Sequence, residues 1–180
     1  VHLQINTSAG VALVELTVAT NITISAVKEQ IAKEAGFQYG MFVKELEVAI
    51  LAGEVDAAVH SAKDMPSDLP PGLSIAAFGA RHDARDVLID RWGVPFTELP
   101  AGAMLGTSSP RRTAQLKYLR QEIEFLPIRG NVGTRMDNAG GDEYDGVVLA
   151  AAGVARLGRS DEISEYFPPS VSTPDAGQGA

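Results

Sequence analysis

The sequence predicts an α/β protein, because short apolar segments of strand length alternate along the chain with longer segments of helical periodicity. Glycine and proline clusters separate these segments and mark the turns between them. Of the 180 residues, 45% are hydrophobic, which is ample for a buried core. A chain of this length forms either one ordinary domain or two small lobes.

The first elements predicted are two strands, at residues 1–5 and 11–18. Apolar and polar side chains alternate in both segments, and a Thr-Ser-Ala-Gly turn at residues 7–10 lies between them. This pattern is typical of a hairpin. Residues 22–35 then carry apolar side chains at helical spacing, followed by Gly36, which predicts an amphipathic helix.

A second helix is predicted over residues 42–52, with Gly53 to end it. It leads directly into a predicted strand at residues 55–59. After a loop rich in proline and glycine, residues 73–78 are apolar enough for another buried strand.

The clearest helical pattern covers residues 111–120. Ser108 or Ser109 can cap its amino terminus, and Pro110 suits its first turn. The start of a helix exposes backbone N–H groups, so this position can attract an anion.

The rest of the chain completes a second lobe. Three strands are predicted there, at residues 87–89, 124–128 and 146–151, and a short helix is predicted at residues 132–138. We expect the chain to divide near Ala80, into a first lobe of residues 1–79 and a second of residues 80–180.

Composition excludes several classes of function. The net charge is −8, so no positive field exists to gather nucleic acid or a membrane surface, and neither is expected as a partner. The chain has no cysteine and only three histidines, far apart, so no metal site is expected. No apolar run has membrane-spanning length and no secretion signal is recognised, which favours a cytoplasmic protein.

One candidate for chemistry is the pair Lys63 and Asp64, which follows the predicted strand at 55–59. Beyond the carboxyl end of a buried strand, a carboxylate can steady a developing cation, and a lysine can bind a substrate carboxylate. The alternative is an exposed ion pair at a turn. The nearby His60 is interpreted as a packed histidine more readily than as a base.

Arginines form the second candidate. Residues 106–112 (GTSSPRR) combine small residues, hydroxyl side chains including that of Ser109, a helix start, and the adjacent Arg111 and Arg112. Amide donors and forked guanidinium groups suit a carboxylate or phosphate. Successive helix residues point in different directions, so only one of the two arginines can face a ligand comfortably unless the site wraps the end of the helix. The alternative is a helix cap followed by a solvated basic turn.

Three further arginines follow the same design. Arg129 and Arg135 flank another predicted junction between a strand and a helix. Arg156 follows the strand that ends near residue 151 and can join them; the alternative is an ordinary surface arginine. Several arginines brought separately to such junctions of an acidic protein imply a ligand with many carboxylates.

Five motifs resemble one family. They are FVKELE, VHSAKDMP, GTSSPRR, RGNVGTR and GQGA, at residues 42–47, 59–66, 106–112, 129–135 and 177–180. In this order they are similar to hydroxymethylbilane synthase, also called porphobilinogen deaminase. The resemblance covers the chain from about Gly40 to its last residue.

The resemblance implies a fold, a reaction and a cofactor. The fold is α/β, with two lobes resembling type II periplasmic binding proteins and the ligand cleft between them. The reaction joins four porphobilinogen units head to tail with loss of ammonia, giving a linear tetrapyrrole for haem synthesis. The cofactor is a dipyrromethane held by a cysteine of a third domain, and a monomer is expected.

The resemblance also assigns residues. Asp64 is implied as the catalytic carboxylate that assists ammonia loss and stabilises cationic intermediates, with Lys63 beside it. Substrate and cofactor carboxylates are implied to be bound by Ser109, Arg111, Arg112, Arg129, Arg135 and Arg156.

Some family features are missing. Residues 1–39 lack the family's Thr-Arg-x-Ser and Thr-Arg-Gly-Asp segments, and Tyr39 stands where the family has a lysine. The third domain is absent from this sequence, which has no cysteine to attach a dipyrromethane. The rival hypothesis is therefore a non-catalytic, two-lobed protein that binds a polycarboxylate or another small anion.

Overall fold

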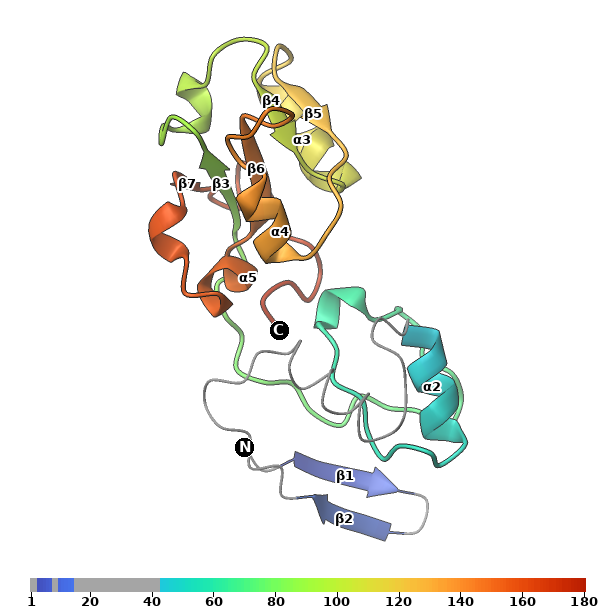
Figure 1. Ribbon diagram of the computed structural model, residues 1–180. Helices are drawn as coiled ribbons and strands as arrows, with labels where there is room; N and C mark the ends of the chain where they lie inside the picture. The colour runs from blue at the N-terminus through green and yellow to red at the C-terminus, as the bar shows by residue number, and fades with distance from the viewer. Residues whose placement is uncertain (1–2, 8–9, 15–42) are drawn as a thin grey trace. The chain divides into compact units, whose positions relative to one another are not determined.

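The computed structural model describes residues 3–7, 10–14 and 43–180 (Figure 1). The helix predicted at residues 22–35 lies outside these ranges. The chain divides into two compact units. The first comprises residues 1–80 together with Ala180, and the second comprises residues 81–179.

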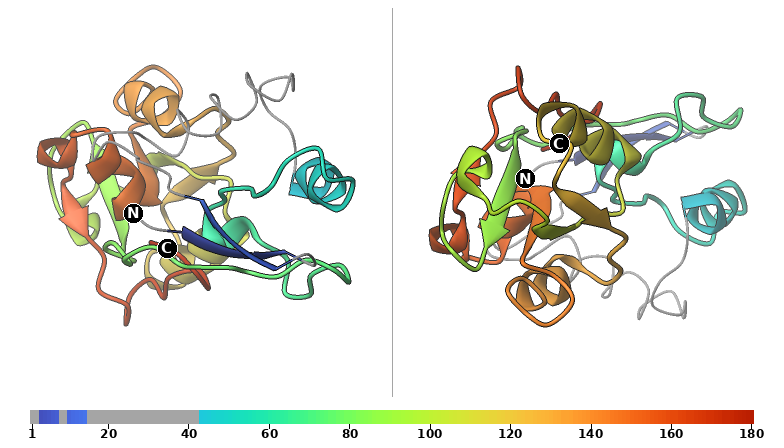
Figure 2. Two further views of the ribbon diagram at one scale, coloured as in Figure 1. Left: turned by 90° about the horizontal axis from the view of Figure 1, so that it is seen from below. Right: turned by 90° about the horizontal axis from the view of Figure 1, so that it is seen from above.

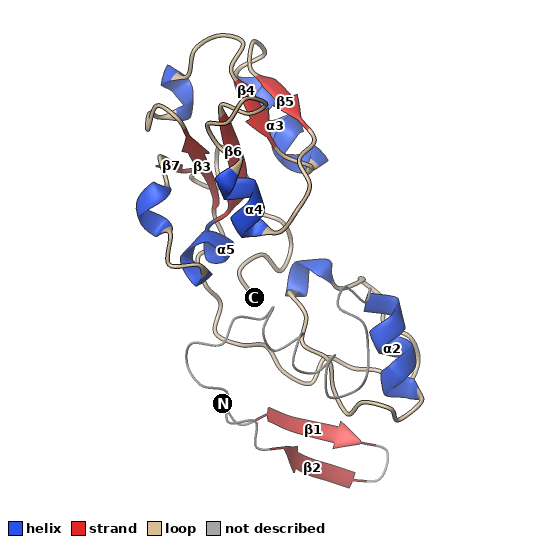
Figure 3. Ribbon diagram, viewed as in Figure 1, coloured by secondary structure: helices blue, strands red, loops and turns tan. Residues whose placement is uncertain are grey.

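The first unit contains the predicted hairpin. Strands β1 (Leu3–Thr7) and β2 (Gly10–Val14) pair antiparallel, with Leu3 opposite Val14 and Thr7 opposite Gly10 (Figure 3). The pairing confirms the hairpin predicted from the alternation around the turn.

Helix α2 (Val43–Leu51) confirms the second predicted helix. Its Ala49 is buried, whereas Val48 and Leu51 are exposed. Gly53 ends the helix as expected, at a φ of 72° that side chains rarely adopt, and its N–H donates to the carbonyl of Ile50.

Two strands predicted in the first unit are wrong. Residues 55–59 and 73–78 have no regular secondary structure, and Ile75 and Phe78 are 47% and 65% exposed. A strand requires a neighbouring strand for its backbone hydrogen bonds, and neither segment pairs with any described strand. The only regular element between them is the 3-10 helix η1 (Ala62–Asp64).

The second unit is built on a sheet of five strands. In sequence order these are β3 (Asp86–Asp90), β4 (Met104–Gly106), β5 (Glu124–Leu126), β6 (Gly146–Ala150) and β7 (Glu165–Tyr166). Their order in the sheet is β5-β4-β6-β3-β7. The predicted strands at 87–89, 124–128 and 146–151 are confirmed with small changes in bounds, whereas β4 and β7 were not predicted.

Short helices connect these strands. They are η2 (Phe96–Glu98), α3 (Pro110–Leu119), α4 (Val132–Asp137), α5 (Ala151–Arg156) and η3 (Ser160–Glu162). Helices α3 and α4 confirm the two predictions made for this part of the chain.

Alternate side chains of the sheet enter two separate cores. On one face, Leu88, Leu105 and Val148 pack with Leu116 of α3. On the other face, Met136 of α4 and Val154 of α5 pack against the strand residues Val87, Ile89, Val147 and Leu149. Figure 2 shows α3 and α4 on opposite faces of the sheet. The unit therefore has three layers, and consecutive residues of β3 and β6 are buried because both faces of the sheet are covered.

Strand direction determines where the loops lie. Strand β4 runs parallel to both β5 and β6, so the carboxyl ends of all three strands lie at one edge of the sheet. Strand β3 is antiparallel to β6 and begins at the same edge, with Asp86 opposite Ala150. In open α/β sheets, ligands usually bind to the segments that follow the carboxyl ends of the parallel strands. We call this side of the sheet, formed by the segments after β4, β5 and β6 and by the start of β3, the carboxyl edge.

The chain passes between the two units at 80–81 and again at 179–180. On the second unit these two passages lie side by side. The N–H of His82 donates to the carbonyl of Gly179 at 2.8 Å, and Arg81 Nε donates to the carbonyl of Gln178 at 3.1 Å.

Candidate functional site

The start of α3 lies at the carboxyl edge, directly after β4. Ser109 is the N-cap, and its Oγ accepts a hydrogen bond from the N–H of Arg112 at 3.4 Å. Ser108 instead joins the loops after β4 and β5, because its Oγ accepts from the N–H of Ile128 at 3.1 Å. Of the two caps considered from the sequence, the structure therefore selects Ser109.

Arg111 and Arg112, both predicted to bind a ligand, converge on the carboxylate of Asp86 at the start of β3. Nη1 of Arg111 lies 2.8 Å from Oδ2 of Asp86. Nε and Nη2 of Arg112 lie 2.9 Å and 2.8 Å from Oδ1. The Arg111 side chain is 24% exposed and that of Arg112 only 8%, so Arg111 faces outward more than its neighbour does.

Two residues from the end of the chain complete this cluster. Ser172 Oγ donates to Oδ2 of Asp86 at 2.8 Å, and Gln178 Nε2 donates to Oδ1 at 2.9 Å. We call Asp86, Arg111, Arg112, Ser172 and Gln178 the Asp86 network. Every member except Arg111 is buried.

Sequence reasoning missed Asp86. The available signal was an aspartate placed directly before the buried Val87, where a charge is costly unless it is paired. Burial raises the pKa of Asp86, but hydrogen bonds from Arg111 and Arg112 and the charge of Arg112 lower it more, so that the pKa is below its ordinary value of 3.8. The carboxylate is therefore ionised at neutral pH.

Arg135 lies close to the Asp86 network. Its Nε donates to the carbonyl of Gly130 at 2.8 Å. Burial, and then the positive charge of Arg112, lower the pKa of the Arg135 guanidinium. This like-charge repulsion favours binding of an anion nearby.

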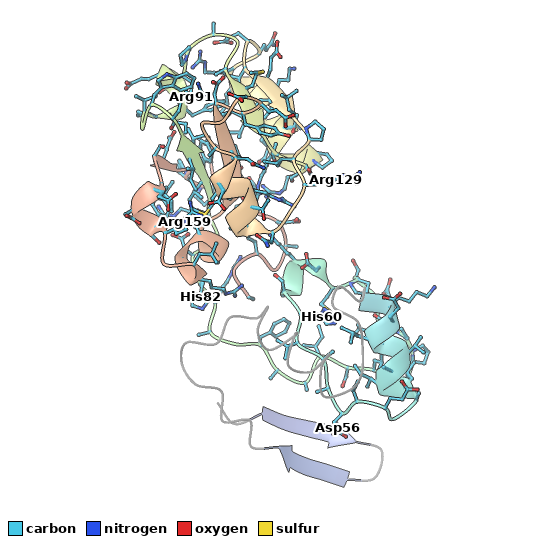
Figure 4. The ribbon with its side chains drawn as sticks, in the orientation of Figure 1. Asp56, His60, His82, Arg91, Arg129 and Arg159 are labelled. Atoms are coloured by element: carbon cyan, nitrogen blue, oxygen red, sulfur yellow. The ribbon has the colours of Figure 1, made fainter. Side chains whose placement is uncertain are left out.

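Arg129 and Arg156 have no counterion in the part of the chain that the structure describes. Both are exposed, on the segment after β5 and at the end of α5, and neither forms a hydrogen bond or ion pair within the described ranges. Figure 4 shows Arg129 on the segment between β5 and α4. Long cationic side chains without partners are available to a ligand.

Other arginines of this unit are already paired. Arg91 lies 3.2 Å from Asp145, at the opposite end of the sheet, and Arg159 lies 2.7 Å from Asp137 (Figure 4). These two ion pairs contrast with Arg129 and Arg156, which have no counterion within the described ranges.

The predicted catalytic pair belongs to the first unit. Asp64 is exposed at the end of η1, and Lys63 is half-buried beside it in the chain. Backbone hydrogen bonds position η1: the N–H of Asp64 donates to the carbonyl of Ser61 at 2.9 Å, and the N–H of Ala62 donates to that of Ala180 at 3.0 Å. His60, labelled in Figure 4, is half-buried.

The described ranges contain neither a candidate metal cluster nor a membrane-spanning helix. No group of three or more histidine, cysteine, aspartate or glutamate side chains there could hold a metal ion. None of the described helices has the length and apolar character needed to cross a membrane.

Known proteins resemble this chain closely. Residues 11–180 match a family model described as porphobilinogen deaminase, dipyromethane cofactor binding domain. A porphobilinogen deaminase of Lachnospira eligens is 54% identical over 142 residues, which are 78% of this chain and 48% of the relative. Those of Desulfitobacterium hafniense and Clostridium kluyveri are each 51% identical over 141 residues, 78% of this chain and 46% and 49% of the relative.

The chain thus spans about half the length of the curated relatives it matches. The match to the family model begins at residue 11, within the first unit, and includes η1, the whole second unit and its carboxyl edge. The chain belongs to the porphobilinogen deaminase family, also called the hydroxymethylbilane synthase family.

Proposed function

We propose that this chain carries the substrate-binding and catalytic residues of a hydroxymethylbilane synthase. The reaction would join four porphobilinogen units into a linear tetrapyrrole. In each condensation a C–N bond of the aminomethyl group breaks, ammonia leaves, and a C–C bond forms to the next pyrrole ring, which loses a proton.

The observation that carries this proposal is the set of arginines at the carboxyl edge. Arg129 and Arg156 lack any counterion in the described ranges, and Arg135 is repelled by Arg112. Porphobilinogen carries an acetate and a propionate group, and a chain of such units carries many. Forked guanidinium donors bind carboxylates in pairs of parallel hydrogen bonds.

Each proposed residue has a separate task. The carboxylate of Asp64 would stabilise the positive charge that develops on the pyrrole as ammonia leaves, and Lys63 would bind a substrate carboxylate nearby. Carboxylates would be bound at the second unit by Ser109, Arg111, Arg112, Arg129, Arg135 and Arg156. Arg112 has only one donor left for this purpose, because its other N–H groups already have acceptors.

The dipyrromethane named in the family description fits the same residues. Its acetate and propionate groups require cations, and the Nε of Arg111 is a buried donor that has no acceptor among residues 3–7, 10–14 and 43–180. When bound, a dipyrromethane supplies the free pyrrole carbon on which the chain of rings grows. This sequence has no cysteine, so it supplies no thiol for attachment.

The partner proposed for this chain is porphobilinogen, and the proposed compartment is the cytoplasm. The rival hypothesis of a non-catalytic binding protein is not favoured, since the relatives that cover 78% of the chain are named as deaminases.

A matched pair of variants tests the enzymatic proposal. Purified chain is incubated with porphobilinogen while ammonia release and uroporphyrin formation are followed. Asp64→Asn removes the proposed cation stabiliser and is expected to slow turnover by about a hundredfold or more. Asp68→Asn makes the same change in a nearby exposed loop and should leave turnover unchanged.

If the wild-type chain turns over porphobilinogen and the Asp64→Asn variant does so at the same rate, the proposed role of that carboxylate is excluded. Tight porphobilinogen binding by the wild-type chain without any ammonia release would instead support the non-catalytic rival.

A further inference from the structure

The Asp86 network contains more positive than negative charge. Two guanidinium groups converge on one carboxylate, which leaves one net positive charge at the start of α3. The exposed N–H groups of a helix amino terminus add to this positive potential. Asp86 therefore neutralises only part of the charge that a ligand meets at this edge.

Asp86 also determines which donors remain available on Arg111. Nη1 of Arg111 donates to Asp86 and to the carbonyl of Thr173, and Nη2 donates to Asp86 at 3.3 Å. The guanidinium thus meets Asp86 with its Nη1–Nη2 edge. Its Nε and the second proton of Nη2 are left. Nε is buried and has no acceptor among the described residues, so its hydrogen bond is unmade until a ligand acceptor reaches it. A carboxylate binds such an Nε–Nη2 edge through two parallel hydrogen bonds.

Arg112 is held on the inner side of the same carboxylate. Its Nε and Nη2 donate to Asp86, its Nη1 donates to the carbonyl of Val148 at 3.1 Å, and Nη2 also reaches Gln178 at 3.4 Å. These contacts come from β3, β6 and the end of the chain, so they fix this side chain in one place.

The remaining contacts fix Asp86 itself. Ser172 and Gln178 donate to its two different oxygens, and Gln178 Nε2 also donates to the carbonyl of Ala84 at 2.6 Å. Each carboxylate oxygen therefore has one arginine and one neutral donor at close distance. A carboxylate held in this way cannot turn to follow either arginine.

We propose that Asp86 is a positioning residue, which occupies the Nη1–Nη2 edge of Arg111 and buries Arg112 so that the Nε–Nη2 edge of Arg111 is presented to a ligand carboxylate. This inference rests on the proposed function, because it assumes that the carboxyl edge binds porphobilinogen or a longer pyrrole chain. Asp86 itself does not touch the ligand.

The first test needs no ligand. Hydrogen exchange of arginine Nε–H groups with water is measured by ¹H–¹⁵N NMR on the intact chain. In Asp86→Asn the Nε–H of Arg112 loses its ionised acceptor and should exchange about tenfold faster or more. Asp83→Asn removes an exposed carboxylate that pairs with Arg85 at 2.6 Å, and should leave the Arg112 signal unchanged.

The second test adds porphobilinogen to the same samples. In the wild-type chain the Nε–H signal of Arg111 should shift on titration, and Asp86→Asn should abolish that shift and weaken binding by about tenfold. Asp83→Asn should bind as the wild type does. If Asp86 made only an ordinary structural contact, Asp86→Asn would lower the melting temperature but would not change the Arg111 Nε–H signal selectively.

A milder variant keeps the inference testable if Asp86→Asn does not fold. Ser172→Ala removes one donor from Oδ2 of Asp86 and retains every charge, and it should speed exchange at the Nε–H groups of Arg111 and Arg112 by about threefold. Unchanged exchange in a folded Asp86→Asn, or in Ser172→Ala when Asp86→Asn is unfolded, would overturn the positioning role.

The two proposals fail in different ways. If the wild-type chain does not bind porphobilinogen, the proposed function is wrong, and so is the ligand-presenting part of this inference, even when the exchange data show that Asp86 orders both arginines. If the wild type binds porphobilinogen and Asp86→Asn binds it equally well, only the positioning role is wrong.

Discussion

Gly179 lies directly against the backbone carbonyl of His82, so that a Cβ atom at position 179 would be only 2.6 Å from that oxygen. The same two residues share a hydrogen bond of 2.8 Å from the N–H of His82 to the carbonyl of Gly179. The chain passes between its two units at residues 80–81 and 179–180. The contact between His82 and Gly179 holds these two segments together within the second unit.

Gly179→Ala is therefore expected to be strongly destabilising. Gly179 has a φ of +91°, which costs about 1–2 kcal/mol for an alanine. The clash with the His82 carbonyl adds a further cost, typically about 1–3 kcal/mol for overpacking. Denaturant unfolding measures the sum.

Gly158→Ala is the matched control. Gly158 has a φ of +69°, but a Cβ atom at this position would meet nothing within 4 Å, so only the conformational cost applies, about 1–2 kcal/mol. Equal losses of stability in the two variants would show that the contact between residues 179 and 82 is unimportant.

Asp86→Asn tests the charge of the Asp86 network through the pH dependence of stability. Removing one partner of a buried ion pair costs about 3–5 kcal/mol, and we expect this loss at neutral pH. Because the folded-state pKa of Asp86 is below 3.8, its stabilisation is complete above that value and is lost as the pH falls through the folded-state pKa. The difference between wild type and variant should therefore shrink below pH 3.8.

Chemical denaturation at several pH values measures this difference. A gap between the two proteins that stays constant down to the acid limit of folding would mean that the pKa of Asp86 is the same in the folded and unfolded proteins, and would contradict the lowered pKa.

Ser109→Ala tests the helix cap. Loss of the Ser109 Oγ acceptor leaves the N–H of Arg112 without its cap and should lower the free energy of unfolding by about 1 kcal/mol. Ser170→Ala, an exposed serine in the loop after β7, should change it by less than about 0.5 kcal/mol. A cap effect no larger than the control would indicate that Ser109 does not stabilise α3.

The arginines should separate into two classes in ligand-free stability measurements. Arg129→Gln and Arg156→Gln remove exposed groups without counterions in the described ranges and should alter the free energy of unfolding by less than about 0.5 kcal/mol. Arg112→Gln leaves Asp86 buried with fewer donors and should cost about 3–5 kcal/mol. Similar thermal unfolding of all three variants would contradict this division.

Much of the second unit could be predicted because its signals are local. A serine and Pro110 ahead of a helical pattern predict the start of α3, and the apolar run around Leu88 predicts β3. The short strands β4 and β7 were missed since three and two residues carry too little pattern.

The errors arise where structure depends on distant partners. Residues 73–78 have the composition of a strand, but no described strand offers them hydrogen bonds, and Phe78 is exposed. Likewise, the pairing of Asp86 with Arg112, Ser172 and Gln178 depends on the sheet order and on the return of the chain end. Sequence spacing contains no information on such contacts.

The central claim is that arginines of the carboxyl edge bind the carboxylates of porphobilinogen. Calorimetric titration of porphobilinogen into the wild-type chain, Arg129→Gln and Lys117→Gln tests it most directly, because Lys117 is an exposed cation of α3 outside the proposed site. We predict that Arg129→Gln weakens binding by about tenfold or more, whereas Lys117→Gln binds as the wild type does. Equal affinities of all three proteins, or no binding by the wild type, would contradict the claim.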